Sequence, residues 1–224
     1  MTEYLPVTTI LGWCAAAGIL FGSIMAIAQR DFKRMLAYST VAQVSYIGLG
    51  IGLANPLGLI GALLHILNHA FMKSCLFLVV GGIRHQTGLR EIPWFSGLGR
   101  HMPLMMAAFS MAALSMVGIP PTAGFVSKWY LVQGTLEAGQ GVFTVTLLLS
   151  GLLNAGYLFP IVTRAFFAPS KRFSKFDEAS AWMMIPLVLT AVLSLLLGVF
   201  PEQTFQLFRL AASVASSVIS GGGL

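Results

Sequence analysis

Residues 57–83 read LGLIGALLHILNHAFMKSCLFLVVGGI, an apolar stretch with two histidines and a lysine near its middle. A hydrocarbon core about 30 Å thick requires roughly 20 apolar residues in one helix, so this stretch is long enough to cross a bilayer. His65, His69 and Lys73 follow one another at intervals of four residues, which places them on one helix face. Ionisable side chains inside a membrane span are costly and usually face a protein interior. The stretch therefore predicts a membrane protein with a polar interior.

The composition of the whole chain supports this prediction. Of the 224 residues, 57% are hydrophobic and 9% are charged, and the mean hydropathy is +0.85. An average soluble domain is about 25% charged. The net charge of +6 would suit a nucleic-acid partner only as a basic stripe on a water-facing surface. Cys14 and Cys75 lie in apolar runs without the spacing of a disulfide framework or a zinc site. These observations exclude soluble enzymes and nucleic-acid-binding proteins.

Six apolar stretches are long enough to be membrane spans. They are residues 10–28, 36–53, 57–83, 103–136, 142–167 and 182–200. The sequence therefore predicts an all-α membrane protein whose residues 1–201 form one transmembrane domain. Residues 202–224 form an amphipathic tail, which we expect to lie as a short helix at the membrane interface or against a partner.

The fourth stretch, residues 103–136, can be one broken span or two. Counted as one, it places three basic loops on the same side of the membrane. These loops carry Arg30, Lys33, Arg34, Arg84, Arg90, Arg100, Lys171, Arg172 and Lys175. The opposite loops, at residues 54–56 and 137–141, carry no Lys or Arg. The positive-inside rule then puts the basic loops in the cytoplasm and both termini outside, so we expect six spans with a broken fourth.

The break is expected at Gly118-Ile119-Pro120-Pro121, which Gly124 follows closely. Two prolines remove two backbone N–H donors, and carbonyls freed inside the membrane must be satisfied by protein or by water. Broken helices in transporters line the path of the ion or substrate. A proline kink that affects only packing is the alternative, and the residues alone leave both interpretations open.

The row of His65, His69 and Lys73 spans about 12 Å along a helix at 1.5 Å per residue. Histidine exchanges protons near neutral pH, and a lysine shielded from water can exist in a neutral form. Such a row suits a proton relay in which water fills the gaps. Structural histidines are one alternative. Another is a metal or haem site, but no further acid or His falls on the spans, and Cys14 and Cys75 form no Cys/His pattern, so we expect no metal and no cofactor.

Two further groups of residues are candidates for the same path. Lys128 follows the prolines by seven residues and lies too far inside its span for simple snorkelling to the headgroups. Ser39, Gln43 and Tyr46 form an uncharged polar row on the second span. This row either lines a hydrated cavity or supplies ordinary hydrogen bonds between helices, and the sequence favours neither.

Three motifs together resemble one family. They are AQRDFKRMLAYST at residues 28–40, LHILNHAFMK at residues 64–73 and GIPPTAGFVSK at residues 118–128. In this order they are similar to the antiporter-like, proton-translocating membrane subunits of respiratory complex I. The same family includes the large subunits of Mrp-type cation/proton antiporters and of membrane-bound hydrogenases. The third motif is most similar to the Mrp D-type branch.

The resemblance implies a fold and a role for each candidate. Members of the family contain two inverted five-helix repeats, each with one broken helix, followed by a final helix. By resemblance, the first five spans of this chain are the second repeat, and residues 182–200 are the final helix. His65, His69 and Lys73 would lie on the central polar axis, and Lys128 would be the broken-helix lysine of the exit half-channel. The family's first repeat is missing from this chain, so we expect a partner chain to supply it.

We therefore expect a membrane subunit that forms half of a proton, or cation/proton, pathway in a larger complex of the cytoplasmic (inner) membrane. It would make no covalent bonds itself, and any redox reaction would belong to partner subunits. An assembly module with vestigial channel residues and a stand-alone secondary transporter are the alternatives. The sequence indicates neither the second cation nor the source of energy.

Overall fold

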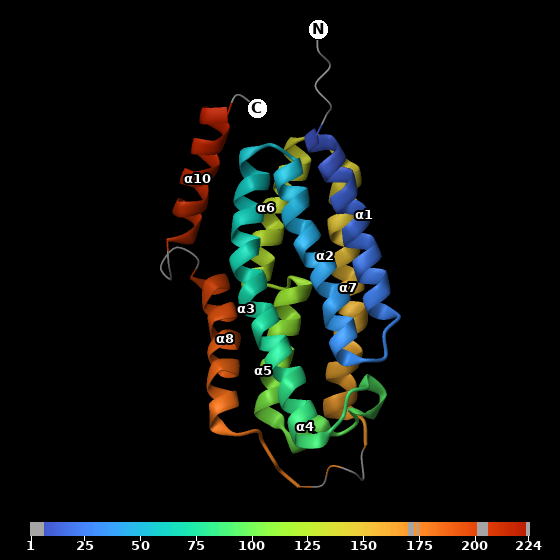
Figure 1. Cartoon of the computed structure of the whole chain (residues 1–224). Coiled ribbons are helices and arrows are strands. Elements are labelled where there is room, and N and C mark those ends of the chain that lie inside the picture. Colours follow the sequence, from blue (N-terminus) through green and yellow to red (C-terminus); the bar gives the residue numbers. More distant parts are fainter. Residues whose placement is uncertain (1–6, 170–172, 174, 201–205, 223–224) are drawn as a thin grey trace.

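A computed structural model describes residues 7–169, 173, 175–200 and 206–222 of the chain (Figure 1). Within these residues the protein is all-helical, as predicted, with nine α-helices and one 3₁₀ turn. Lys171 and Arg172 of the third basic loop lie outside the described residues, as does the predicted domain boundary at residue 201.

Nine helices and the 3₁₀ turn follow one another along the described chain. They are α1 (Val7–Ile27), α2 (Phe32–Gly52), α3 (Pro56–Thr87), the 3₁₀ turn η1 (Ile92–Trp94), α4 (Leu98–His101), α5 (Pro103–Val117), α6 (Ala123–Glu137), α7 (Gly141–Phe167), α8 (Ala181–Val199) and α10 (Leu207–Gly222). By length and composition, α1, α3, α7 and α8 can each cross a membrane.

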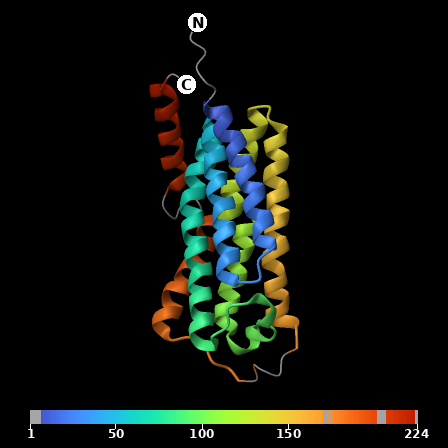
Figure 2. The ribbon, with the colours of Figure 1, turned by 45° about the vertical axis from the view of Figure 1, so that its right-hand side comes forward.

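The fourth predicted span is interrupted at the expected place. Helix α5 ends at Val117 and α6 begins at Ala123, with 15 residues in each. Fifteen residues extend about 22 Å, which is less than the thickness of a hydrocarbon core. Figures 1 and 2 show the two helices stacked end to end among α1, α2, α3 and α7. Neither helix alone covers the length of the bundle, so the interruption lies in its interior.

Helices α8 and α10 follow one another along the outside of the bundle (Figure 1). Gly198, near the end of α8, touches the backbone of Pro121 and Thr122, so α8 ends at the level of the interruption. Ala211 and Ala215 of α10 pack against α3 in the other half. Helix α8 therefore lies beside one half of the bundle, and the helix of the predicted tail packs along this chain's own α3.

Local residues fix the ends of the inner helices. The Asp31 carboxylate accepts the backbone N–H of Arg34 at 2.9 Å and caps α2. The Asn55 side chain accepts the N–H of Gly58 at 2.8 Å, and Pro56 occupies the first turn of α3. Capping of this kind satisfies donors that the first helical turn leaves without partners. The Asn55 amide also donates to the Gly134 carbonyl at 2.7 Å, which ties α3 to α6.

Helices α1 and α2 approach each other closely at Gly22. A Cβ atom on this residue would lie 2.6 Å from the backbone nitrogen of Ala42 and 2.9 Å from the carbonyl oxygen of Tyr38. Both obstructing atoms belong to the backbone of α2, so no side chain can move aside. Small residues at crossing points are the usual way for membrane helices to pack closely. This crossing fixes α2, which carries one wall of the polar interior.

We predict that Gly22→Ala destabilises the protein while Gly81→Ala does not. Gly81 is the matched control, because it also lies inside a helix but a Cβ atom there would meet nothing within 4 Å. Overpacking at Gly22 is expected to cost about 1–3 kcal/mol, whereas alanine in place of an unhindered helical glycine is neutral or favourable. Thermal denaturation in mild detergent measures the difference. Equal denaturation temperatures for the two variants would contradict the close crossing.

Candidate functional site

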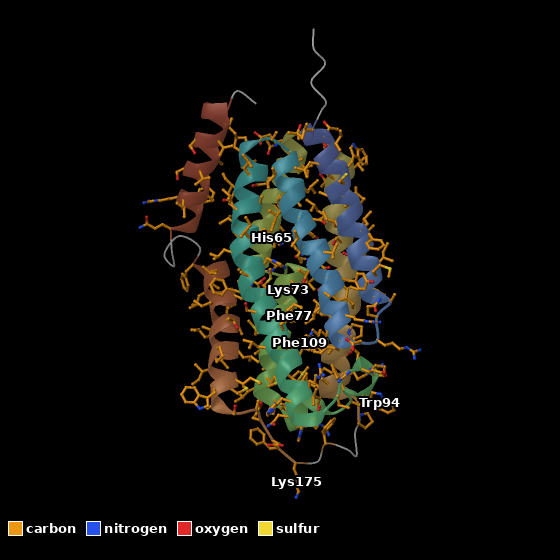
Figure 3. The ribbon with its side chains drawn as sticks, in the orientation of Figure 1. His65, Lys73, Phe77, Trp94, Phe109 and Lys175 are labelled. Atoms are coloured by element: carbon orange, nitrogen blue, oxygen red, sulfur yellow. The ribbon has the colours of Figure 1, made fainter. Side chains whose placement is uncertain are left out.

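Buried polar side chains gather on the inward faces of α2, α3, α6 and α7. They include Ser39, Gln43, His65, Asn68, Lys73, Ser127, Ser150 and Asn154. Figure 3 shows His65 and Lys73 one after the other along α3, with Phe77, which is 37% exposed, and the buried Phe109 of α5 next toward the end where α4 lies. The interior is therefore polar in its middle and apolar toward that end.

The two histidines form a stacked pair. The ring centroids of His65 and His69 are 6.2 Å apart, with 17° between the ring planes, and the Tyr46 ring also stacks on His65, with 5.3 Å between centroids. His65 Nδ1 lies 2.9 Å from the Ser127 hydroxyl. The Nε2 atoms of both histidines are buried and have no hydrogen-bond partner among the described residues. Buried polar atoms in this situation are places where water binds.

Lys73 points from α3 toward α2. Its amine donates to the Leu36 carbonyl at 2.9 Å and to the Ser39 hydroxyl. The Ser39 hydroxyl itself donates to Leu36 at 2.9 Å. The side chain of Lys73 is only 6% exposed. Its partners are neutral oxygen atoms, so the described residues hold the amine without an ion pair.

Lys128 points back across the interruption. Its amine donates to the carbonyls of Met116 at 2.5 Å and Val117 at 3.1 Å, the last two residues of α5. The same amine lies 5.1 Å from the centroid of the Tyr46 ring. A helix C-terminus is the negative end of the helix dipole and attracts a cation. Lys128 therefore binds the interruption itself and does not extend to the membrane surface.

Gly118 and Gly124 allow the interruption to form. Gly118 ends α5 with a φ of +91°, the left-handed region that glycine enters at little cost. Gly124 packs so closely on Ser115 that a Cβ atom would overlap the Ser115 carbonyl. Pro120 and Pro121 lie between the two helices and donate no backbone hydrogen bond. Together these residues free the carbonyls that Lys128 contacts.

Two further side chains bond the backbone on either side of the interruption. Asn68 donates to the Ala123 carbonyl at 2.7 Å, and Asn154 donates to the Met116 carbonyl at 3.3 Å. Neither residue was among the sequence candidates. The interruption is therefore held by three helices, since Asn68 lies on α3, Lys128 on α6 and Asn154 on α7.

Helix α7 supplies a polar row that was not among the predicted site residues. The Tyr157 hydroxyl donates to the Asn154 side-chain oxygen at 2.8 Å. Asn154 in turn donates to the Met116 carbonyl that Lys128 contacts. Ser150, Asn154 and Tyr157 have the same spacing as the row predicted on the second span. That spacing could have identified the row from the sequence. It was not singled out because no His, Lys, Asp or Glu belongs to it.

Ser39, Gln43 and Tyr46, the predicted polar row on α2, have different contacts. Ser39 bonds Lys73, and the Tyr46 hydroxyl donates to the Leu147 carbonyl at 3.4 Å. Gln43 is fully buried, and neither its amide nitrogen nor its amide oxygen has a partner among the described residues. Gln43 therefore contributes no side-chain hydrogen bond between the described helices.

The described residues contain no group of three or more His, Cys, Asp or Glu that could hold a metal ion. Cys75 is buried and Cys14 is exposed, and neither forms a disulfide there. The chemistry that this arrangement offers is hydrogen bonding and proton exchange.

The chain matches a known family and several of its relatives in sequence. Residues 2–154 match the family described as NADH:quinone oxidoreductase/Mrp antiporter, TM. The chain is 50% identical over 212 residues to NADH-quinone oxidoreductase subunit N of Desulforudis audaxviator, with 88% of this chain aligned to 42% of that protein. It is 34% identical over 211 residues to F(420)H(2) dehydrogenase subunit N of Methanosarcina mazei, with 89% aligned to 42%. The chain thus spans less than half the length of these relatives.

Solved structures share the fold. A chain of the Mrp complex from Dietzia sp. superposes with a TM-score of 0.88 at 23% identity, covering 96% of this chain and 48% of that one. A chain of respiratory complex I from Thermus thermophilus with bound NADH superposes with a TM-score of 0.82 at 27% identity, covering 93% and 44%.

We predict that Gly118→Ala disturbs Lys128, and that Gly139→Ala is its matched control. Both glycines have a positive φ, so alanine should cost about 1–2 kcal/mol of backbone strain at either position. Only at Gly118 would the new Cβ atom lie 2.9 Å from Lys128 Cδ, whereas nothing lies within 4 Å at Gly139. Thermal denaturation should show a larger loss of stability for Gly118→Ala. Equal losses would mean that Lys128 does not pack on the turn.

Proposed function

Because the chain belongs to the NADH:quinone oxidoreductase/Mrp antiporter transmembrane family, we propose that it forms half of a proton, or cation/proton, translocation pathway within a larger membrane complex. The observation that carries the proposal is a pair of inward-pointing lysines, Lys73, which is buried, and Lys128, which is partly buried. Lys128 donates to the freed carbonyls of the interruption, and Lys73 donates to a carbonyl and a hydroxyl of α2.

The partners of these amines explain why they suit proton transfer. An amine paired with a carboxylate must break an ion pair before it can release its proton. Among the described residues, Lys73 and Lys128 instead bond neutral oxygen atoms. Either amine can therefore give up a proton to water and keep a hydrogen-bonded position. Ionisable groups placed in this way inside a membrane protein are typical of proton relays.

The stacked histidines lie between the two lysines and supply the proposed relay. His69 is one helical turn from Lys73, and His65 bonds Ser127, the residue that precedes Lys128. Their open Nε2 atoms can each bind a water molecule that bridges to the next group. Asn154 and Tyr157 act as positioning residues in this proposal. The Asn154 amide holds the Met116 carbonyl in place but is a poor proton carrier, and the Tyr157 hydroxyl orients Asn154.

The proposal extends to the arrangement of the chain in the membrane. Helices α1, α2, α3, the α5–α6 pair and α7 would be the second five-helix repeat, and the chain from α8 onward would complete a six-span unit. The loops rich in Lys and Arg would face the cytoplasm across the inner membrane. A partner chain would supply the first repeat, which is consistent with the longer relatives. Redox chemistry, where the complex performs it, would belong to other subunits.

We predict that Lys128→Arg abolishes proton translocation but leaves the complex assembled. Arginine keeps the positive charge and can still donate to the Met116 and Val117 carbonyls, but it does not release its proton in proteins. Alanine is less informative, because it would also leave these carbonyls without their amine donor. The control is Lys175→Arg on an exposed loop. Translocation is measured as acidification of inverted membrane vesicles, with the amount of complex determined in parallel.

Wild-type acidification by Lys128→Arg would contradict the proposal. It would show that only the charge of Lys128 is required, as expected of an assembly module with vestigial channel residues.

We predict smaller effects for the histidines than for the lysines. In His65→Ala and His69→Ala, water can fill the space of the lost imidazole, so partial translocation should remain. Lys73→Met should lose translocation, because methionine leaves no side-chain group at this position that can bind and release a proton. The vesicle assay compares the three variants at equal amounts of complex. A histidine variant less active than Lys73→Met would mean that the imidazoles themselves carry the proton.

A further inference from the structure

A cavity of about 330 Å³ lies between the start of α2, the end of α3 and the loop that follows α3, away from the proposed pathway. Its lining consists of Asp31, Phe32, Lys33, Arg34, Ala37, Val80, Arg84, Leu89 and Arg90. Its volume falls within the range of small-molecule pockets, about 300–1,000 Å³. Four cations and one carboxylate line a space that is otherwise apolar.

The four cations have no acidic partner in the part of the chain that the structure describes. No ion pair joins Lys33, Arg34, Arg84 or Arg90 to a carboxylate there. The one acid, Asp31, already accepts the backbone N–H of Arg34 as the cap of α2. The cavity therefore holds a formal excess of three positive charges, which a bound anion would neutralise.

The backbone holds these cations together before any ligand binds. The N–H of Phe32 donates to the Arg90 carbonyl at 3.0 Å, and the N–H of Ile92 donates to the Arg30 carbonyl at 2.9 Å. These two bonds form a short antiparallel bridge between the two loops. The loop with Arg90 is thereby fixed beside the first turn of α2, so the site needs little rearrangement to bind.

The cavity continues as an apolar groove along α2. A second space of about 450 Å³ shares Arg34 and Ala37 with the first and is also lined by Gln29, Tyr38 and Val41. Val41 lies two helical turns beyond Lys33, toward the middle of the bundle, and is 45% exposed. A ligand that fills both spaces has an anionic group at one end and a hydrocarbon chain at the other.

The position of the cavity in the bundle agrees with such a ligand. Exposed tryptophans mark the membrane–water interface in many membrane proteins. Trp94 is 60% exposed and lies, as Lys175 does, at the end of the bundle where α4 lies (Figure 3), and Trp182 at the start of α8 is 89% exposed. The basic cavity is therefore at the depth where lipid phosphates lie.

We propose that this cavity binds an anionic phospholipid, with the phosphate among the four cations and an acyl chain along Ala37 and Val41. A free phosphate ion would use the cations but not the apolar groove. The lipid would fix the start of α2 against the end of α3, next to the turn of α2 that carries Ser39.

The test measures lipid binding to the full chain, purified in mild detergent with the subunits that accompany it. The probe is fluorescent phosphatidylglycerol, compared with phosphatidylcholine of the same acyl chains and with inorganic phosphate as competitor. The variant is Lys33→Gln combined with Arg84→Gln. Its matched control is Arg30→Gln combined with Arg100→Gln, which removes two cations of the same basic loops outside the cavity.

We expect phosphatidylglycerol to bind in preference to phosphatidylcholine, and millimolar phosphate not to displace it. The cavity variant should bind about 30-fold more weakly, since each basic side chain near an anionic surface contributes a factor of about five. The control variant should bind as the wild type does.

An equal loss in both variants would show a diffuse charge effect. Displacement by inorganic phosphate would show a free-anion site, and a neighbouring subunit cross-linked at Arg84 would show a protein contact. Each of these results would overturn the proposal.

Discussion

The requirement to satisfy backbone hydrogen bonds inside a membrane governs the centre of this protein. The prolines between α5 and α6 interrupt the helical ladder, so carbonyls at the end of α5 lose their intrahelical partners. Lys128 and Asn154 donate to those carbonyls, and Asn68 donates to the first residue of α6. A positive charge is thereby held in the interior by the backbone itself.

The surrounding helices are arranged to support this interruption. Helix α3 brings Asn68 and the two stacked histidines to it, and α7 brings Asn154, which Tyr157 orients. Helix α8 ends against it, and Ser194 of α8 donates to Ser115 of α5 at 2.9 Å. The second lysine, Lys73, is bonded to α2 instead, so the two amines belong to different walls of one polar interior. Because the two amines do not contact each other, a proton could pass between them only through intervening groups, which is the role proposed for the histidines.

The sequence predicted the features that depend on local chemistry. The two prolines and Gly118 located the interruption, and the spacing of His65 and His69 predicted a shared face, which their stacking confirms. Features that depend on packing were not predictable in this way. Hydropathy indicated a membrane span at residues 182–200. It carries no information on the position of that helix along the bundle, where α8 lies beside one half and ends at the interruption (Figure 1). The partners of Lys73 and Lys128 are mostly backbone carbonyls of other helices, and no sequence pattern identifies a carbonyl.

The central claim is that Lys73 and Lys128 belong to one proton path. A double-variant cycle tests it most directly, with proton flux measured in membrane vesicles for Lys73→Met, Lys128→Arg and the two combined, at equal amounts of complex. The effects of two substitutions in one path on proton flux are not additive, because a path that is interrupted once loses no further flux when it is interrupted again. The account predicts the same low flux in all three variants. Appreciable flux in both single variants, with a further drop in the double variant, would contradict it, because each lysine would then serve a separate path.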